Sequence, residues 1–391
     1  MAGERLEKAL KRYRTRYWKA SGKRERGELL TEFCQATGYH RKYAIGLLNR
    51  HEETHEPRRR RGVSYSKQAM RVVERIWEKA GHPWSKRLKA LLPLWLPWAR
   101  KHIPELTPEV EEEVLKISAR QIDRRLKEKK RTLKGKLYGR TKPGTLLKHA
   151  IPIKTAWREV KEPGFVEIDL VAHCGPCASG EFGYSLNLTD LYTGWVETRA
   201  ILGKSEGEVV KALDEMRRQL PFPLRALKSD NGSEFINHHL FRYCGSRHLE
   251  FWRTRPYEKN DNAHIEQKNW THVRKLFGWQ RYDTPETIAA MNEVYRTPWR
   301  QMMNLFMPSV KLVSKERVGA RLRRKYDAPQ TPLDRLIQSY GKNPLPLPVQ
   351  RLELTRVKLD PFELSQAIDK GVVRVEQLRR RAKGEKETCA L

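Results

Sequence analysis

The sequence predicts a multi-domain protein of mixed α+β and α/β class, and three observations lead to this prediction. The chain has 391 residues, which is more than one ordinary domain holds. Its first part has apolar residues at helical spacing, whereas from about Gly164 apolar and polar residues alternate as in half-buried strands. Helical patterns then return and continue into a basic tail. We expect all-α modules, then a mixed sheet with flanking helices, then a mostly helical basic region.

The charge of the chain indicates a polyanionic partner. Lysine and arginine number 79 and the acids 47, which gives a formal net charge of +32. Such an excess repels itself, and nucleic acid is the partner that relieves it most directly. A basic ribosomal-type protein and a membrane-surface binder are the alternatives, but 38% apolar residues and eleven tryptophans indicate large packed cores rather than a basic tail.

The sequence has the features of a cytoplasmic protein. Its N-terminus has no apolar run behind the charges, and the longest apolar stretch, Ala90 to Ala99, is short and interrupted by Pro93 and Pro97. We therefore expect neither a signal peptide nor a membrane span. Five scattered cysteines form no disulfide framework and fit a reducing cytosol.

A helix-turn-helix is expected near the N-terminus. Residues 27–50 have helical apolar spacing on both sides of a turn at Gly38. Arg41 and Lys42 stand at the start of the second helix, where a recognition helix presents side chains to DNA. An ordinary helical hairpin is the alternative.

A second helical region follows, with its own candidate DNA contacts. Thr107 supplies an N-cap, and Ser118 begins a further helix that carries Arg120 and Arg124. Between Lys127 and Lys154 the chain then has ten basic residues and one acid, with glycine and proline interspersed. Such a run is usually a solvated surface, but its position beside two helical DNA-binding candidates favours a flexible linker that contacts phosphates. The candidate contacts in this linker are Lys134, Lys136 and Arg140.

The alternating segment predicts five strands and three helices in the order β-β-β-α-β-α-β-α. The first three strands follow one another closely and so pair antiparallel, whereas the last two are reached through helices and so lie parallel. This is the ribonuclease-H-like arrangement. The expected strands lie at 166–170, 184–188, 194–201, 224–229 and 249–254, and the helices begin near 205, 237 and 262.

These patterns divide the chain into five regions. The expected boundaries are 1–60 for the helix-turn-helix, 64–126 for the second helical region, 127–160 for the basic linker, 161–282 for the sheet domain and 283–391 for the C-terminal region.

Three acids from distant parts of the chain are expected to converge on the sheet. Asp169 lies on the first strand, on the face opposite Ile168 and Leu170, and Asp230 ends the neighbouring fourth strand. Glu266 lies in the first turns of the last helix. Carboxylates gathered without cations disfavour one another's ionisation, so such a cluster predicts divalent metal ions, with magnesium the expected metal. Two ions about 4 Å apart can activate the attacking oxygen and stabilise the leaving oxygen of a phosphodiester displacement.

The sequence around these acids resembles a known family. Asp230 lies in Ser-Asp-Asn-Gly-Ser-Glu-Phe, and Glu266 follows Arg-Pro-Tyr-Glu-Lys-Asn-Asp-Asn-Ala-His-Ile, with 35 residues between the two acids. The stretch from Pro163 to Trp279 resembles the catalytic core of bacterial insertion-sequence transposases of the DDE type, which is also that of retroviral integrases. The match depends on the strand, turn and helix contexts, because the spacing by itself is shared by many pairs of acids.

The resemblance implies what the chain does. It implies a transposase that cleaves double-stranded DNA at the terminal inverted repeats of its element and joins the freed 3′ end to target DNA, as a homo-oligomer in a bacterial, nucleoid-associated setting. Two Mg²⁺ ions, replaceable by Mn²⁺, would be held by Asp169, Asp230 and Glu266. Asn231 and Gly232 would shape the turn at Asp230, and Lys268 and Asn269 would touch DNA near the cleaved bond.

Two other motifs carry less weight. Cys174 and Cys177 form a Cys-Gly-Pro-Cys tetrapeptide, but a redox motif should begin a helix, whereas this one falls in the turn between the first two strands. Cys244 and His248 have the spacing of a zinc-ligand pair, but Cys244 is expected to be buried in a helix, so no zinc is assigned.

Two further functions remain as alternatives to a transposase. A catalytically inactive, transposase-derived DNA-binding regulator is disfavoured by the complete acidic triad. A ribonuclease-H-like nuclease that only cuts is disfavoured by the helix-turn-helix candidates ahead of the core, since a simple nuclease needs no sequence readout.

Overall fold

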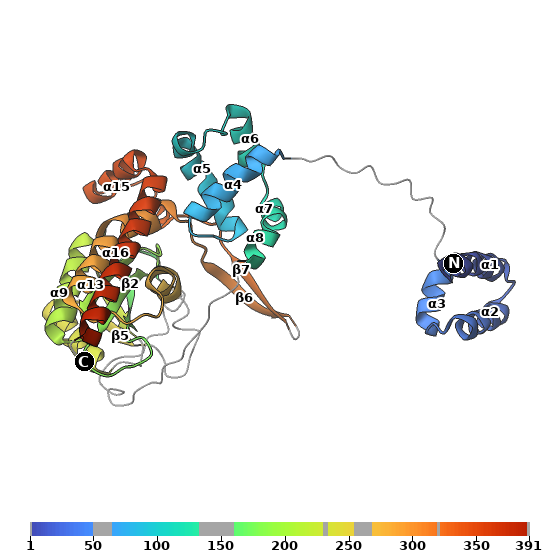
Figure 1. Ribbon diagram of the computed structural model, residues 1–391, viewed down its shortest axis with the longest axis horizontal. Helices are drawn as coiled ribbons and strands as arrows, with labels where there is room; N and C mark the ends of the chain where they lie inside the picture. The colour runs from blue at the N-terminus through green and yellow to red at the C-terminus, as the bar shows by residue number, and fades with distance from the viewer. Residues whose placement is uncertain are drawn as a thin grey trace. The chain divides into compact units, whose positions relative to one another are not determined.

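The computed structural model describes residues 2–49, 65–132, 160–229, 234–253, 268–318 and 321–388 (Figure 1). The chain forms two compact units, which are Met1–Ser64 and Tyr65–Leu391. The boundaries expected inside the second unit stay predictions.

The first unit is a small helical bundle. It consists of α1 (Ala2–Lys19), α2 (Lys23–Thr37) and α3 (Arg41–Leu48) in its described part. Gly38 ends α2 at φ 71° and its N–H donates to the Cys34 carbonyl, a left-handed cap that glycine adopts without steric cost. Phe33 and Leu48 fill the core between the helices. The two helices predicted around Gly38 are present, and their use in DNA binding stays a prediction.

The second unit begins with helices that continue further than expected. Ser66, Thr107 and Ser118 each cap a helix with a side-chain oxygen, as the sequence predicts for the last two. The helix after Leu126 was expected to be flexible linker, but Lys127–Thr132 is helical because the buried Leu126 holds this turn against the preceding helices. Lys134, Lys136 and Arg140 lie outside the described residues. The helices are α4 (Lys67–Lys79), α5 (Ser85–His102), α6 (Pro108–Lys116), α7 (Ala119–Arg125) and α8 (Lys127–Thr132).

A mixed five-stranded sheet forms the centre of the described second unit, in the order β3-β2-β1-β4-β5. The first three strands pair antiparallel, β4 pairs parallel to β1, and β5 pairs parallel to β4, as the order of strands and helices predicts. The fold class is therefore mixed α/β with abundant helix, and the expected meander followed by two crossover strands is confirmed. The strands are β1 (Phe165–Ala172), β2 (Gly183–Asp190), β3 (Val196–Leu202), β4 (Ala226–Ser229) and β5 (Glu250–Arg253).

Helices cover both faces of this sheet. On one face, α9 (Glu206–Gln219) and α10 (Glu234–Ser246) pack on apolar side chains such as Ile168, Leu186 and Ile201. Asn292 of α13 (Pro285–Val294) caps the outer edge of β3 by exchanging hydrogen bonds of 2.8 Å with both backbone groups of Ala200. On the other face of the sheet, the Tyr295 hydroxyl is hydrogen-bonded to the Ser185 hydroxyl of β2 at 2.8 Å. The sheet is thus a buried middle layer, and its central strand β1 is accessible chiefly at its end.

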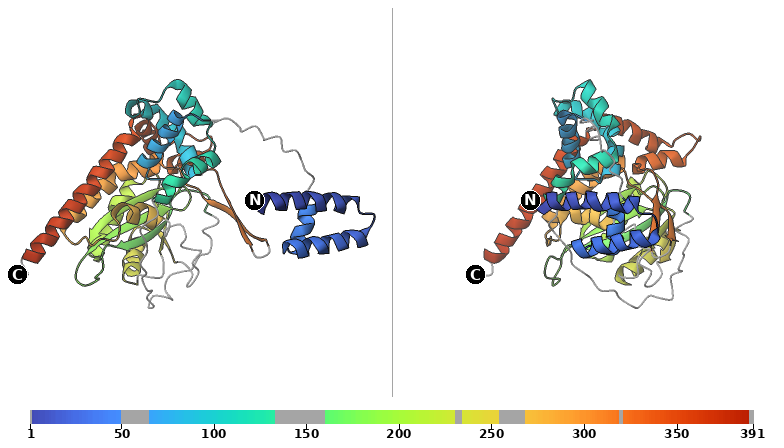
Figure 2. Two further views of the ribbon diagram at one scale, coloured as in Figure 1. Left: turned by 45° about the vertical axis from the view of Figure 1, so that its right-hand side comes forward. Right: turned by 90° about the vertical axis from the view of Figure 1, so that its right-hand side faces the viewer.

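The C-terminal region packs back onto the helices that precede the sheet. The Trp95 ring of α5 meets Phe362 of α16 at 5.1 Å, and His102 Nε2 lies 2.8 Å from the Asp360 carboxylate. In Figure 2, α16 begins beside the helices of residues 65–132 and extends along α13. The helices of residues 65–132 and the described helices after the sheet therefore share one hydrophobic core.

A β-hairpin interrupts the region that was expected to be mostly helical. Its strands are rich in charged residues, and the apolar Val313 is 63% exposed, so the sequence lacks the apolar alternation that would reveal them. The elements from the last predicted core helix onward are η2 (Asn269–Arg274), α12 (Lys275–Phe277), α13, η3 (Tyr295–Trp299), η4 (Met302–Phe306), β6 (Leu312–Val318), β7 (Arg321–Tyr326), α14 (Pro332–Ser339), α15 (Leu347–Lys358) and α16 (Pro361–Thr388), where η marks a π-helical segment.

The contact between α13 and α16 generates a prediction for stability. A Cβ on Gly371 of α16 would lie 2.4 Å from Cγ2 of the buried Val294 of α13, so Gly371→Ala must push the two helices apart. We expect a loss of about 1–3 kcal/mol in the free energy of unfolding, measured by urea titration. Gly207→Ala is the matched control, because the space around this helical glycine is open, and it should be neutral or slightly stabilising. Equal values for the two variants would contradict the prediction.

Candidate active site

Asp169 lies on the central strand, beside the strand that leads into Asp230. In β1 the neighbouring Ile168 points to the apolar face under α9 and is 2% exposed, so Asp169 is on the other face, as predicted. Ile168 pairs with Ser229 at the end of β4, and Asp230 is the next residue of the chain. Asp230, Asn231, Gly232 and Glu266 themselves lie outside the described residues.

A chain of polar side chains connects Asp169 to the helix that follows Glu266. Asn269 Nδ2, at the start of η2, donates to Asp169 Oδ2. Its Oδ1 accepts from Asn187 Nδ2 of β2 at 3.0 Å, and Asn187 Oδ1 accepts from the Thr198 hydroxyl of β3 at 3.1 Å. Asn187 is fully buried, so the amides are held in one orientation by their partners. The predicted residue Asn269 thus positions Asp169.

An ion pair lies next to Asp169 on the same face of the sheet. Lys228 Nζ of β4 is 3.2 Å from Glu167 Oε1 of β1, and both side chains are at most 3% exposed. Removing one charge from such a pair leaves the other uncompensated in the interior. The pair therefore links β1 to β4 through residues that stand two positions before Asp169 and Asp230 in the sequence.

Lys268 lies in a different environment from its neighbour Asn269. Its Nζ donates to the Gly194 carbonyl at 3.1 Å. Burial, with the Arg87 and Arg335 guanidinium groups nearby, lowers the pKa of Lys268 to about 7. Burial and the same kind of cationic surroundings keep the pKa of His272 well below its usual range, so this imidazole is neutral.

Lys311 is a further cation of this group, and it comes from a part of the chain in which no sequence motif was identified. Its Nζ donates to the Tyr192 carbonyl and lies 5.0 Å from the centre of the Tyr192 ring. Burial and the nearby Arg335 lower its pKa to about 8, although Asp190 and Asp327 act in the opposite direction. Arg87 and Lys311 were not identified from the sequence, because each is a single basic residue far from the triad and only the fold brings it near Lys268.

The described part of the site fits a hard cation only through Asp169. Its carboxylate is partly exposed and accepts hydrogen bonds from Asn269 and from the Leu170 N–H. Carboxylate oxygens are the ligands that hard cations such as Mg²⁺ prefer. Within the described ranges, no three His, Cys, Asp or Glu side chains are grouped so as to hold a metal. Because Asp230 and Glu266 lie outside these ranges, the three-ligand site stays a prediction.

The other predicted DNA contacts are exposed where they are described. Arg41 and Lys42 stand at the first turn of α3, and the Arg41 guanidinium donates to the Thr31 hydroxyl at 2.8 Å. Arg120 and Arg124 are exposed on α7. All four side chains are accessible to a polyanion, and their contact with DNA stays a prediction.

The Cys174–Cys177 tetrapeptide lies in the loop between β1 and β2, as predicted. The guanidinium of Arg281 holds this loop by donating to the Cys177 and Ser179 carbonyls, at 2.9 and 3.0 Å. No helix begins there, and the exposed Cys177 is hydrogen-bonded to the Ser179 hydroxyl. Cys244 is buried in α10, as predicted.

Comparison with known proteins gives one relative over most of the chain. Over 335 residues the sequence is 36% identical to the uncharacterized protein y4rM of Sinorhizobium fredii (strain NBRC 101917 / NGR234), which covers 85% of this chain and 94% of that protein. No protein-family model matches the chain. Among the described residues, no helix has the length and apolar character to cross a membrane.

The lowered pKa of Lys268 generates a prediction for pH dependence. Between about pH 7 and pH 10 the unfolded chain keeps a proton on Lys268 that the folded chain has released, because the ordinary pKa of 10.5 falls to about 7 on folding. The free energy of unfolding of the DNA-free protein should therefore rise across this window. Lys268→Met should flatten the rise, and Lys342→Met, at an exposed position, should not. Parallel pH profiles for the two variants would contradict this account.

Proposed function

The chain belongs to the same family as the uncharacterized protein y4rM, and we propose that it is a DNA transposase. It cleaves DNA at the ends of its element and joins them to target DNA by two-metal-ion phosphodiester chemistry. The observation that carries the proposal is the place of Asp169, on the central strand of the sheet and beside the strand that leads into Asp230. The strand order supports a ribonuclease-H-like core, in which acids from these two strands meet.

The proposed mechanism assigns roles to this chain's own residues. Asp169, Asp230 and Glu266 would hold two Mg²⁺ ions, for which Mn²⁺ can substitute. Bound metal would supply Lewis acidity and an activated oxygen nucleophile. Asn269 orients the Asp169 carboxylate through its hydrogen bond and so fixes the helix after Glu266 against β1. The protein itself is not modified in either step, because water attacks first and the freed 3′ hydroxyl second.

The rest of the chain would bind and position DNA. The helix pair of α2 and α3 is the proposed reader of the terminal inverted repeats, with Arg41 and Lys42 at its accessible end. The net charge of +32 supports sequence-independent contacts with the phosphates of element and target DNA. We propose a homo-oligomer on DNA in the bacterial cytoplasm, since two element ends must be held together.

Replacing the central carboxylate should abolish joining without abolishing binding. Asp169→Asn keeps the size of the side chain and an acceptor for Asn269 but removes the charge that a metal ion requires. We expect Mg²⁺-dependent joining of a duplex from the flanking inverted repeats to a plasmid to fall more than about a hundredfold, beyond the usual effect of an outer-shell partner. DNA binding in EDTA should remain, and Asp230→Asn and Glu266→Gln should behave alike.

The same assay on the unmodified protein distinguishes a transposase from a regulator and from a nuclease. Binding without cleavage in Mg²⁺ or Mn²⁺ would replace the transposase by a regulator, and cleavage without joining would replace it by a nuclease.

Removing the positioning amide should weaken catalysis rather than eliminate it. Asn269→Ala leaves Asp169 without its side-chain donor, so we expect joining to fall about 10- to 100-fold. A higher Mg²⁺ concentration should restore part of the activity, because a misaligned ligand binds metal more weakly; a purely structural defect would not respond. Asn343→Ala is the control at an exposed asparagine far along the chain. Unchanged joining by Asn269→Ala would remove this residue from the mechanism.

A further inference from the structure

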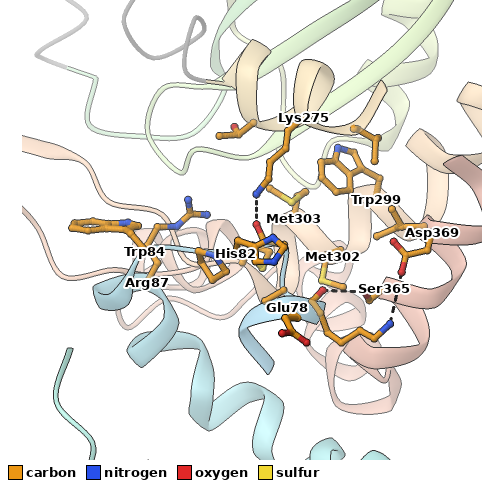
Figure 3. A pocket seen from close by; sticks show the side chains of 18 of the residues that line it. Glu78, His82, Trp84, Arg87, Lys275, Trp299, Met302, Met303, Ser365 and Asp369 are labelled. Atoms are coloured by element: carbon orange, nitrogen blue, oxygen red, sulfur yellow. Dashed lines mark hydrogen bonds and ion pairs between the residues drawn. The ribbon is translucent and has the colours of Figure 1, made fainter. Parts of the chain in front are cut away.

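Two adjoining cavities lie beside η2. Other residues of this segment line them, whereas the Asn269 side chain points to Asp169. The larger, about 630 Å³, is bounded by the α4–α5 turn, η2, α12, η4 and α16, and we refer to it as the aromatic cavity (Figure 3). The smaller, about 330 Å³, is the cationic cavity. Trp84, Arg87, Thr271, Met303 and Met307 line both. Both volumes fall within the roughly 300–1,000 Å³ of small-molecule sites.

The aromatic cavity has flat apolar walls at an accessible surface. Trp84 and Trp270 line it from opposite elements and are 43% and 44% exposed. Trp299, Met302 and Met303 complete its apolar lining. Indole rings and polarisable thioethers are the groups on which a flat aromatic ligand stacks. Partly exposed tryptophans at the rim of such a cavity indicate a ligand of that kind.

The backbone around this cavity is held in unusual conformations. Its lining residues come from each of the π-helical segments of the described chain: Trp270 and Thr271 from η2, Trp299 from η3, and Met302 and Met303 from η4. Such segments are rare and occur most often at functional sites. His82, in the turn before Trp84, has a φ of 62°, a conformation that a non-glycine residue seldom adopts.

The turn that carries Trp84 is nevertheless well fixed. The His82 ring packs edge-on against Trp77 at 4.6 Å, and the Trp77 indole N–H donates to the Pro83 carbonyl at 3.0 Å. Lys275 Nζ of α12 donates to the Gly81 carbonyl, which ties this turn to the helix beyond η2 (Figure 3). The Trp84 ring is therefore presented by a rigid element, which lowers the entropy lost on binding.

The cationic cavity gathers three basic side chains against one carboxylate, that of Asp190, which also lines the cavity and accepts hydrogen bonds from the Gly164 N–H and from Thr193. Arg87, Lys268 and Lys311 donate to the carbonyl oxygens of Pro308, Gly194 and Tyr192, respectively. A carbonyl orients a cation but does not neutralise it. The mutual repulsion of these side chains is what an anion in the cavity would relieve.

We propose that the two cavities together hold one unpaired nucleotide of a DNA strand, with its phosphate on Arg87, Lys268 and Lys311 and its base between Trp84 and Trp270. The shared wall of Trp84 and Arg87 places a stacking surface and a phosphate ligand side by side, which a nucleotide requires. The base must leave its duplex partner to enter the cavity. This nucleotide site adds detail to the proposed function. It rests on that function for the assumption that the bound strand is DNA of the element or of the target.

The location of the site explains why a nucleotide would be held there. Lys268 and Trp270 flank Asn269, the residue bonded to Asp169, so the nucleotide would contact both sequence neighbours of the residue that holds the proposed catalytic carboxylate. Holding an unpaired nucleotide at that position would separate the two strands next to the bond that reacts. It would also align the reacting strand through a stacking contact that is independent of sequence.

Binding of labelled DNA to the full chain in EDTA tests the site without catalysis. The probes are a fluorescein-labelled single strand of about 12 nucleotides, within the usual site sizes of single-strand binders, and the same strand with abasic positions. We expect the abasic strand to bind about tenfold more weakly. Trp84→Ala and Trp270→Ala should each weaken binding of the ordinary strand about tenfold, or about 1.4 kcal/mol, and should abolish the difference between the strands.

Matched variants and a second signal make the result specific. Trp279→Ala removes an equally exposed tryptophan, 43%, that lines neither cavity and should bind as the unmodified protein does. A strand with 2-aminopurine should lose fluorescence on binding, and Trp84→Ala should restore it. Lys311→Gln should lower the dependence of log Kd on log salt by about 0.7, whereas Lys342→Gln should leave it unchanged.

The outcomes separate this site from the proposed function. Equal binding of ordinary and abasic strands, or equal effects of Trp84→Ala, Trp270→Ala and Trp279→Ala, would overturn the nucleotide site even if the protein joins DNA in Mg²⁺. Tryptophan-dependent binding by a protein that joins no DNA would support the nucleotide site and overturn the transposase.

Discussion

The hydrogen bond between Asn269 and Asp169 is the contact on which the arrangement of the site depends. It joins the central strand of a buried sheet to the first residue of η2, and the Asn187 and Thr198 side chains hold it from behind. Successive helical residues point in different directions, so fixing Asn269 also fixes its two neighbours. Lys268 is directed to the Gly194 carbonyl, and Trp270 to the aromatic cavity. One contact thereby orients a candidate catalytic group, a cation and a stacking surface.

The electrostatics near η2 are those of a protein prepared for an anion. Buried opposite charges that serve only the fold are paired directly, as Lys228 and Glu167 are at 3.2 Å. Burial, together with the nearby Arg87 and Arg335, lowers the pKa of Lys268 to about 7. Burial and Arg335 lower the pKa of Lys311 to about 8, even though Asp190 and Asp327 act in the opposite direction. Such an arrangement lowers the stability of the free protein and is retained where a function requires it. A DNA phosphate would reverse both shifts.

The sequence predicts those parts of the structure that depend on local periodicity. Alternation around Ile168 and Leu186 locates β1 and β2, and the helical crossovers after Ser205 and Asn237 are sufficient to predict the parallel placement of β4 and β5. The helix over Lys127–Thr132 and the β6–β7 hairpin were missed, because their sequences are rich in charged residues and have no apolar period. In the site, Asp169, Lys268 and Asn269 stand near recognisable motifs. Arg87 and Lys311 do not, since tertiary contacts alone bring them to Lys268.

The π-helical segments are a further feature that depends on tertiary contacts, and they line the proposed nucleotide site. η3 contains Pro298, which lacks a backbone N–H and so cannot complete the hydrogen-bond ladder of a regular helix. The wider turns in η2 and η4 have no such local cause. Packing must therefore impose them, and the described residues that it brings together there are the tryptophans and methionines of the aromatic cavity. Irregular backbone of this kind is frequent at functional sites, so its concentration at the wall of the aromatic cavity supports the proposed nucleotide site.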